Sequence, residues 1–179
     1  MKRYVALLRA INVGGHTVKM DHLRNLFESI GFANVETFIA SGNVIFGSNS
    51  GNPKTLAQMI EKHLQEHLGY EVKTFVRATS ELAFVAAYKP FSTRELNKVG
   101  SVLYIGFLAE SPSEQARQKL LSYCCETDDL HVSGREIYWL CRTKMGDSKF
   151  SGALLEKILG MRATFRNSTT VRKIAAKYS

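Results

Sequence analysis

The order of strand and helix patterns in the first half of this chain recurs in the second half, and this repeat constrains the fold more than any single motif. An apolar run at residues 4–8 is followed by an amphipathic helical pattern, two short β-rich runs, a second helical pattern and a further strand. A matching series begins at residues 101–108, with corresponding elements roughly 90 to 98 positions apart. The sequence therefore predicts an α+β protein of two tandem units, residues 1–90 and 91–179.

Each predicted unit has the order strand, helix, strand, strand, helix, strand. This order is typical of the ferredoxin-like, or split βαβ, arrangement, in which helices cover one face of a four-stranded antiparallel sheet. We expect the first and third strands of such a sheet to run parallel. The loop that follows residue 8 would then meet residues 47–52, and the turn at Ser41, Gly42 and Asn43 would lie at the opposite end of the sheet.

The connection between the first strand and the first helix is longer than this fold requires. It comprises residues 9–19, RAINVGGHTVK, whereas the corresponding connection in the second half spans only residues 109–111. Because both halves have the same order of elements, the extra length indicates a function of the loop itself. This segment, called loop 9–19 below, is the candidate functional site.

The residue types of loop 9–19 match a binding site for an anionic group. Gly14 and Gly15 permit positive φ and let main-chain amides approach a ligand, and the start of the next helix favours negative charge. Arg9 and Lys19 could neutralise a phosphate or carboxylate, and Asn12 supplies both a donor and an acceptor. The alternative is that apolar residues of the loop hold it against the core and the glycines only allow its turn.

Several other chemistries are not indicated by the sequence. Neither G-x-G-x-x-G nor a complete Walker A motif is present, so no nucleotide is inferred. His63 and His67 have the i, i+4 spacing of metal ligands, but they lack the glutamate of H-E-x-x-H and are interpreted as a partly exposed helix edge. The sequence thus predicts no metal site and no cofactor.

Two segments resemble a known family. The run LLRAINVGGHTVKMDHLRNLFESIGFANVETFIASGNVIF and the ending TFRNSTTVRKIA are similar to the bacterial domain of unknown function 1697. Ala10 replaces its usual glycine, and Ser168 stands where tryptophan is frequent. The resemblance implies a small bacterial cytosolic protein of this fold and no particular activity. Its motifs mark as candidate binding residues Arg9, Asn12, Gly14, Gly15, Lys19, Ser41, Gly42, Asn43, Thr164, Arg166 and Asn167.

Two groups of these candidates also have a purely structural interpretation. Ser41 and Asn43 could belong to nothing more than a tight hairpin between two strands. Arg166 and Asn167 lie between the last predicted strand and the last helix, where Asn167 or Ser168 could simply cap that helix. The sequence leaves open whether these groups join loop 9–19 in one site.

The chain carries a net charge of +8, and most of it lies in the C-terminal segment. From residue 142 onward, nine Lys or Arg face only two acidic residues, a net of +7. Such a segment is either a solvated cationic surface or a contact for the phosphates of RNA or DNA. The strands lack the aromatic-rich signature with which split βαβ RNA-binding domains stack bases, although Phe38, Phe46 and Tyr104 could replace it.

Composition also indicates the compartment. No apolar run approaches the roughly 20 residues that span a bilayer, and the N-terminal residues do not form a signal peptide. Cys124, Cys125 and Cys141 are an odd number of cysteines, which suits reduced thiols. We therefore expect a cytoplasmic protein without membrane contact.

Three functions are compatible with these patterns. The first is a binding module for a small anionic ligand at loop 9–19. The second is nucleic-acid binding through the basic C-terminal segment. The third is an enzyme acting on a phosphorylated or carboxylated metabolite, for which the sequence offers no identifiable nucleophile.

Overall fold

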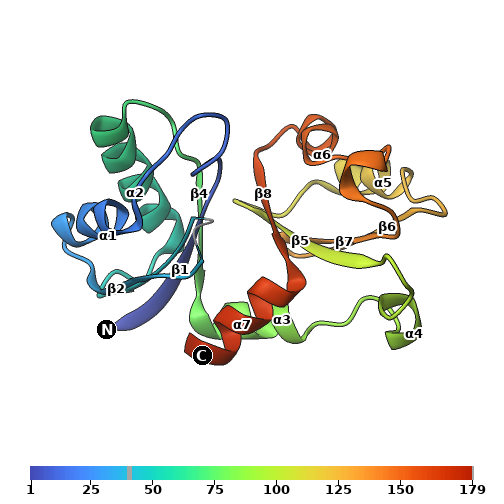
Figure 1. Ribbon diagram of the computed structural model, residues 1–179, viewed down its shortest axis with the longest axis horizontal. Coiled ribbons are helices and arrows are strands. Elements are labelled where there is room, and N and C mark those ends of the chain that lie inside the picture. The colour runs from blue at the N-terminus through green and yellow to red at the C-terminus, as the bar shows by residue number, and fades with distance from the viewer. Residues whose placement is uncertain (40–41, 179) are drawn as a thin grey trace. The chain divides into compact units, whose positions relative to one another are not determined.

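The computed structural model of the protein describes residues 1–39 and 42–178. Contacts divide the chain into two compact units: unit 1 comprises Met1–Ala83 with Lys177–Ser179, and unit 2 comprises Phe84–Ala176. Each unit contains one four-stranded sheet with its own helices (Figure 1). Two further helices, α3 (Thr79–Ala87) and α7 (Ser168–Tyr178), have residues in both units.

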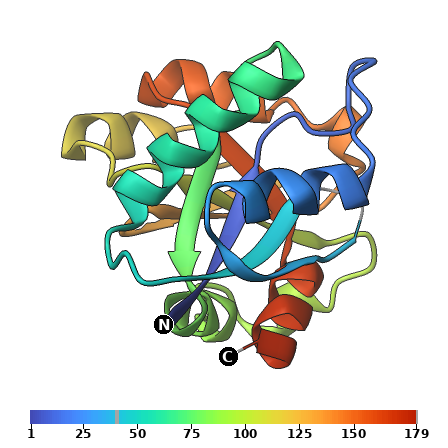
Figure 2. The same cartoon turned by 90° about the vertical axis from the view of Figure 1, so that its left-hand side faces the viewer.

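The main elements of unit 1 are, in chain order, β1 (Lys2–Leu8), α1 (Met20–Ser29), β2 (Ala33–Thr37), β3 (Asn43–Ser48), α2 (Pro53–Leu68) and β4 (Thr74–Ala78). The strand order is β2-β3-β1-β4, and all neighbouring strands are antiparallel. Figure 2 shows α1 and α2 in front of one face of this sheet, with loop 9–19 arching beyond the end of β1 before α1 begins.

The core of unit 1 lies between this sheet face and the two helices. Alternate residues of β1 contribute to it because successive side chains of a strand point to opposite faces. The helices contribute residues three or four positions apart, which share one helix face. Each fully buried large apolar side chain stabilises the fold by about 1.5–3 kcal/mol. These core residues include Tyr4, Ala6 and Leu8 from β1, Leu23, Leu26 and Phe27 from α1, and Leu56, Ile60 and Leu64 from α2.

Helix α2 is capped at both ends. The side chain of Asn52 accepts a hydrogen bond from the main-chain N–H of Lys54 at 2.9 Å, and Pro53 occupies the first helical position. Gly69 ends the helix with φ of 79°, a left-handed conformation that glycine adopts without strain. The caps fix the position of the polar side chains along this helix.

Unit 2 repeats the architecture with the strand order β6-β7-β5-β8, again antiparallel throughout. Trp139, 1% exposed, is central to its core and packs edge-on against Phe150 and Phe165. The elements of unit 2 are α4 (Thr93–Leu96), β5 (Val102–Leu108), α5 (Glu114–Leu121), β6 (Asp128–Ser133), β7 (Glu136–Cys141), the 3-10 helix η1 (Met145–Asp147), α6 (Gly152–Leu159) and β8 (Ala163–Asn167).

The predicted α+β fold with antiparallel four-stranded sheets is confirmed, and one predicted detail is wrong. The first and third strands of unit 1 are antiparallel, because β3 lies between β1 and β2 and runs opposite to both. In unit 2, helix α5 is capped by Ser113, whose hydroxyl accepts from the N–H of Ala116 at 3.2 Å. Among the helices of the described residues, none combines the length and apolar character needed to cross a membrane.

Candidate functional site

Loop 9–19 is held by a main-chain hydrogen bond at its start and by a side-chain hydrogen bond across its width. The N–H of Arg9 donates to the carbonyl of Lys73 at 2.8 Å, which continues the contact between β1 and β4. The side-chain oxygen of Asn12 accepts from the N–H of Val18 at 2.7 Å and closes the loop across its width. Asn12 has φ of 57°, a conformation that asparagine tolerates better than most residues. Asn12 therefore has a structural role in shaping the loop.

The two adjacent glycines form the exposed tip of the loop. Gly14 and Gly15 have φ of 63° and 87°. A Cβ atom at either position would meet nothing within 4 Å. The glycines therefore serve the backbone turn and leave their surroundings open to solvent.

Behind the tip lies a cavity of about 440 Å³, called the loop cavity below. It is bounded by the second half of the loop, the first turn of α1 and the end of α2. Lys19 is the N-cap residue of α1, and in the described part of the chain its exposed side chain makes no capping bond. The cavity is lined by Gly15, His16, Thr17, Val18, Lys19, His22, His67, Leu68 and Tyr70.

Tyr70, which lines the loop cavity, has a buried polar group. Its hydroxyl oxygen is buried, yet among the residues that the structure describes it has no hydrogen-bond partner. The ring stacks on His16 with 3.9 Å between ring centroids. Burial raises the pKa of this phenol, so that the hydroxyl keeps its proton and remains a donor. An unsatisfied buried hydroxyl costs about 1–3 kcal/mol.

The predicted loop residues divide between this cavity and the scaffold. Gly15 and Lys19 line the cavity. Arg9, Asn12 and Gly14 are not among the described residues that line it. The sequence identified the loop but did not indicate that Tyr70 and His67 lie beside it, because the position of the end of α2 relative to the loop depends on how α1 and α2 pack.

The turn before β3 lies at the same end of the sheet as loop 9–19, contrary to the sequence prediction. Since β1 and β3 are antiparallel, the N–H of Leu8 donates to the carbonyl of Gly42 at 2.8 Å. Asn43 is 1% exposed, and its side-chain N–H donates to the carbonyl of Phe38 at 3.0 Å, which makes it a structural residue of the turn. Ser41 lies outside the described residues.

Arg166 and Asn167, at the end of β8, belong to unit 2. Burial lowers the pKa of Arg166 to about 10, and its guanidinium donates to Oγ1 of Thr164 at 2.8 Å and to the carbonyl of Phe165 at 2.9 Å. The side-chain oxygen of Asn167 accepts from the N–H of Thr169 at 2.9 Å, as the structural interpretation of a helix cap predicts. Asn167 also lines a second cavity of about 460 Å³ in unit 2.

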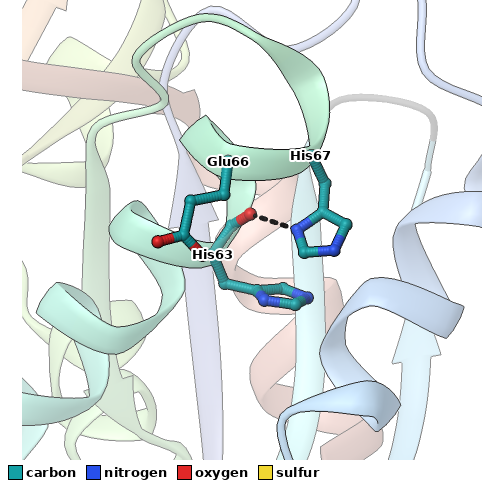
Figure 3. A group of neighbouring side chains, drawn as sticks. All are labelled: His63, Glu66 and His67. Atoms are coloured by element: carbon teal, nitrogen blue, oxygen red, sulfur yellow. Dashed lines mark hydrogen bonds between the residues drawn. The ribbon is translucent and has the colours of Figure 1, made fainter.

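A second group of polar side chains lies on α2 and is called the histidine cluster below. One possible ligand atom from each of His63, Glu66 and His67 lies within 4.8 Å of the other two. The rings of His63 and His67 are 4.1 Å apart, and Figure 3 shows them one above the other with Glu66 on the same turn. Desolvation, followed by the neighbouring His67, lowers the pKa of His63, which favours its neutral form. The sequence analysis noted the spacing of His63 and His67 but interpreted the pair as a helix edge, because it compared it with H-E-x-x-H alone. The order here is H-x-x-E-H, which adds Glu66.

The geometry defines a two-unit α+β protein with a polar cavity at a β–α loop. The chain belongs to the family described as Protein of unknown function (DUF1697), whose profile matches residues 1–138. Among solved structures, it is similar to the conserved bacterial protein SP0830 from Streptococcus pneumoniae, with 24% sequence identity and a TM-score of 0.76. That match covers 99% of this chain and 98% of the other, and it supports the fold alone. No curated protein matches the chain.

Proposed function

We propose that the protein binds a small anionic ligand, bearing a phosphate or carboxylate group, in the loop cavity. The observation that carries this proposal is that Tyr70, which lines the cavity, has a buried hydroxyl with no hydrogen-bond partner among the described residues. A donor in this state is stabilised by a ligand oxygen, and Lys19 on the same cavity supplies the positive charge that an anion requires.

The first turn of α1 adds main-chain donors. The first hydrogen bond inside this helix runs from the N–H of Leu23 to the carbonyl of Lys19. The N–H groups that precede Leu23 in the first turn therefore have no acceptor within the helix. They favour an anion through the helix dipole. The acidic residue of this turn, Asp21, pairs with Arg24, which compensates its negative charge. His22 adds a third type of donor on the same side of the cavity.

Calorimetric titration of the protein with inorganic phosphate, and separately with acetate, tests the proposal. We expect Lys19→Ala to weaken binding of the preferred anion about tenfold, since a charged hydrogen bond contributes about 1.5–3 kcal/mol. Tyr70→Phe should weaken binding while leaving the folded protein as stable as the wild type or more so, because it removes an unsatisfied buried group. Lys119→Ala, an exposed lysine on α5, is the matched control and should have no effect. Absence of binding by both anions, or equal loss in the control, would contradict the proposal.

The cavity of unit 2 is a second candidate for the same ligand class. It is lined by Lys89, Arg172 and the start of α7, together with Asn167. The hydroxyl of Ser101 on this cavity is also buried without a partner among the described residues. Arg172→Ala distinguishes the two sites, because it should affect only an anion bound in unit 2.

We further propose that the two units are tandem ferredoxin-like folds, with domains at 1–90 and 91–179, in a cytoplasmic protein. The strand orders β2-β3-β1-β4 and β6-β7-β5-β8 support the first statement, since both place the first strand between the third and the fourth. The free thiols Cys124, Cys125 and Cys141 suit a reducing compartment. Separate expression of residues 1–90 and 91–179 tests the boundary, because each piece should fold cooperatively if it is a domain.

A further inference from the structure

The histidine cluster combines the ligand types of a transition-metal site. His63, Glu66 and His67 leave one face of α2 because positions i, i+3 and i+4 of a helix are neighbours. We propose that these three side chains bind a divalent transition-metal ion, with Zn²⁺ as the ion that fits them best. Two imidazole nitrogens with one carboxylate are a known ligand set for zinc, whereas Mg²⁺ and Ca²⁺ prefer oxygen ligands alone. The site goes beyond the proposed anion binding and does not depend on it.

The hydrogen bonds of Ser29 determine which nitrogen of His63 is available. The Ser29 hydroxyl donates its single proton to the carbonyl of Leu26 at 2.9 Å. Oγ of Ser29 is also 2.9 Å from Nε2 of His63. Because the hydroxyl proton is already used, the ring must donate in this second contact. The protonated nitrogen of His63 is therefore Nε2, and Nδ1 carries the lone pair that a metal ion requires.

The main chain of α2 determines the available nitrogen of His67 in the same way. Nδ1 of His67 lies 2.9 Å from the carbonyl oxygen of His63, the contact drawn in Figure 3. A carbonyl can only accept, so Nδ1 carries the proton and Nε2 has the lone pair. A hydrogen bond from the second ring nitrogen to a carbonyl is the usual way in which metal-binding histidines are oriented. Both rings are thus oriented as neutral ligands.

Metal binding requires the exposed side chains to rotate. Bonds of about 2.0–2.2 Å place ligand atoms of a tetrahedral zinc ion about 3.4 Å apart. In the structure, one nitrogen or oxygen atom of each of the three side chains lies within 4.8 Å of the other two. Glu66 and His67 are exposed and can rotate, while the capped helix fixes their backbones. His67 also lines the loop cavity, so the remaining coordination position can be filled by water or by a ligand there.

Calorimetric titration of the untagged full chain with Zn²⁺ tests this site. We expect one bound ion, with His63→Ala and His67→Ala each weakening binding at least about tenfold and Glu66→Gln weakening it less. Ser29→Ala should weaken it by up to about tenfold by freeing the ring of His63. Histidine ¹⁵N spectra should show Nδ1 of His63 and Nε2 of His67 as the coordinated nitrogens. This pattern follows from the hydrogen bonds above.

Two controls separate this site from other groups that bind zinc. Cys124 and Cys125 are exposed thiols, and Cys125→Ser should leave the affinity unchanged. Gln65→Ala changes an exposed residue on the same turn and should also have no effect. Loss of binding in Cys125→Ser, retention of full affinity in both histidine variants, or equal affinity for Mg²⁺ would each overturn the proposal.

Discussion

The hydroxyl of Tyr178 donates a hydrogen bond to the carboxylate of Glu36 at 2.9 Å, across 142 positions of the chain. This contact attaches the end of α7 to β2, which explains why Lys177–Ser179 group with unit 1. Arg3 and Lys177 complete the contact, because each forms an ion pair with Glu36 and lies over the ring of Tyr178. Unit 1 is therefore assembled from both ends of the sequence.

Tyr178→Phe tests this contact, because it removes the hydroxyl and keeps the ring. The hydrogen bond from Tyr178 is the main cause that lowers the pKa of Glu36. We expect a loss of about 0.5–1 kcal/mol in the free energy of unfolding at neutral pH, a modest value because the carboxylate is 41% exposed.

The same variant has a definite pH dependence. A carboxylate whose pKa is lowered in the folded state stabilises the protein above its unfolded pKa, and this stability is lost as the pH falls through the folded value. The difference between wild type and Tyr178→Phe should therefore be constant near pH 7 and shrink below the ordinary pKa of 4.5. Urea unfolding across this range measures it, and a difference that grows in acid would contradict the assignment.

Gly42 and Gly15 both have positive φ, but only Gly42 is enclosed. A Cβ atom at Gly42 would lie 3.1 Å from Cβ of Leu8 and 3.2 Å from its carbonyl oxygen, whereas at Gly15 it would meet nothing within 4 Å. We expect Gly42→Ala to destabilise the protein by roughly 2–3 kcal/mol and Gly15→Ala by about 1 kcal/mol, the cost of the backbone conformation alone. If both variants unfold at the same urea concentration, the backbone at Gly42 can shift to accommodate the added Cβ atom, and the larger predicted loss is wrong.

The sequence predicted what is local and missed what depends on packing. Apolar periodicity located the strands and helices, because this signal acts within a few residues. The predicted direction of β1 and β3 was wrong although the order of elements implies the correct one: a helix connects the parallel strands β1 and β2, and a tight turn makes β3 antiparallel to both. The role of Tyr70 was not predicted, since the burial of its hydroxyl depends on how the end of α2 packs.

Asp128 organises the core of unit 2 and should be its most sensitive polar residue. It is 0% exposed, and its carboxylate accepts from Nε1 of Trp139 at 2.7 Å and from the hydroxyl of Ser148 at 2.8 Å. Asp128→Ala leaves the buried indole N–H without its acceptor, so we expect a loss of roughly 3 kcal/mol. Ser148→Ala should cost only about 1 kcal/mol, because Asp128 keeps the indole as a donor. Fluorescence of Trp139, the single tryptophan, reports unfolding of both variants.

Nucleic-acid binding through the basic C-terminal segment should be weak. Arg142 pairs with Asp129 at 3.1 Å, Arg162 pairs with Glu156 at 3.3 Å, and the guanidinium of Arg166 donates to Oγ1 of Thr164 and to the carbonyl of Phe165. Phe46, one of the aromatic residues considered for base stacking, is 0% exposed. We therefore expect little affinity for single-stranded RNA in fluorescence anisotropy at low salt. Tight binding that falls by orders of magnitude between about 50 and 200 mM salt would instead favour a phosphate-binding surface.

Substitutions at Asn12 and Lys19 should show that Asn12 stabilises the conformation of loop 9–19, whereas Lys19 binds the anion. Asn12→Ala removes the acceptor of the Val18 N–H and places alanine at φ of 57°, so we expect a loss of roughly 2 kcal/mol in stability. Asn12→Asp keeps the acceptor and should recover most of that loss. Lys19→Ala removes an exposed charge and should change stability by less than about 0.5 kcal/mol while weakening phosphate binding. Thermal unfolding and phosphate titration of the same three variants decide the matter: if Lys19→Ala destabilises the protein as much as Asn12→Ala does, Lys19 is part of the scaffold and the anion must be held by other residues.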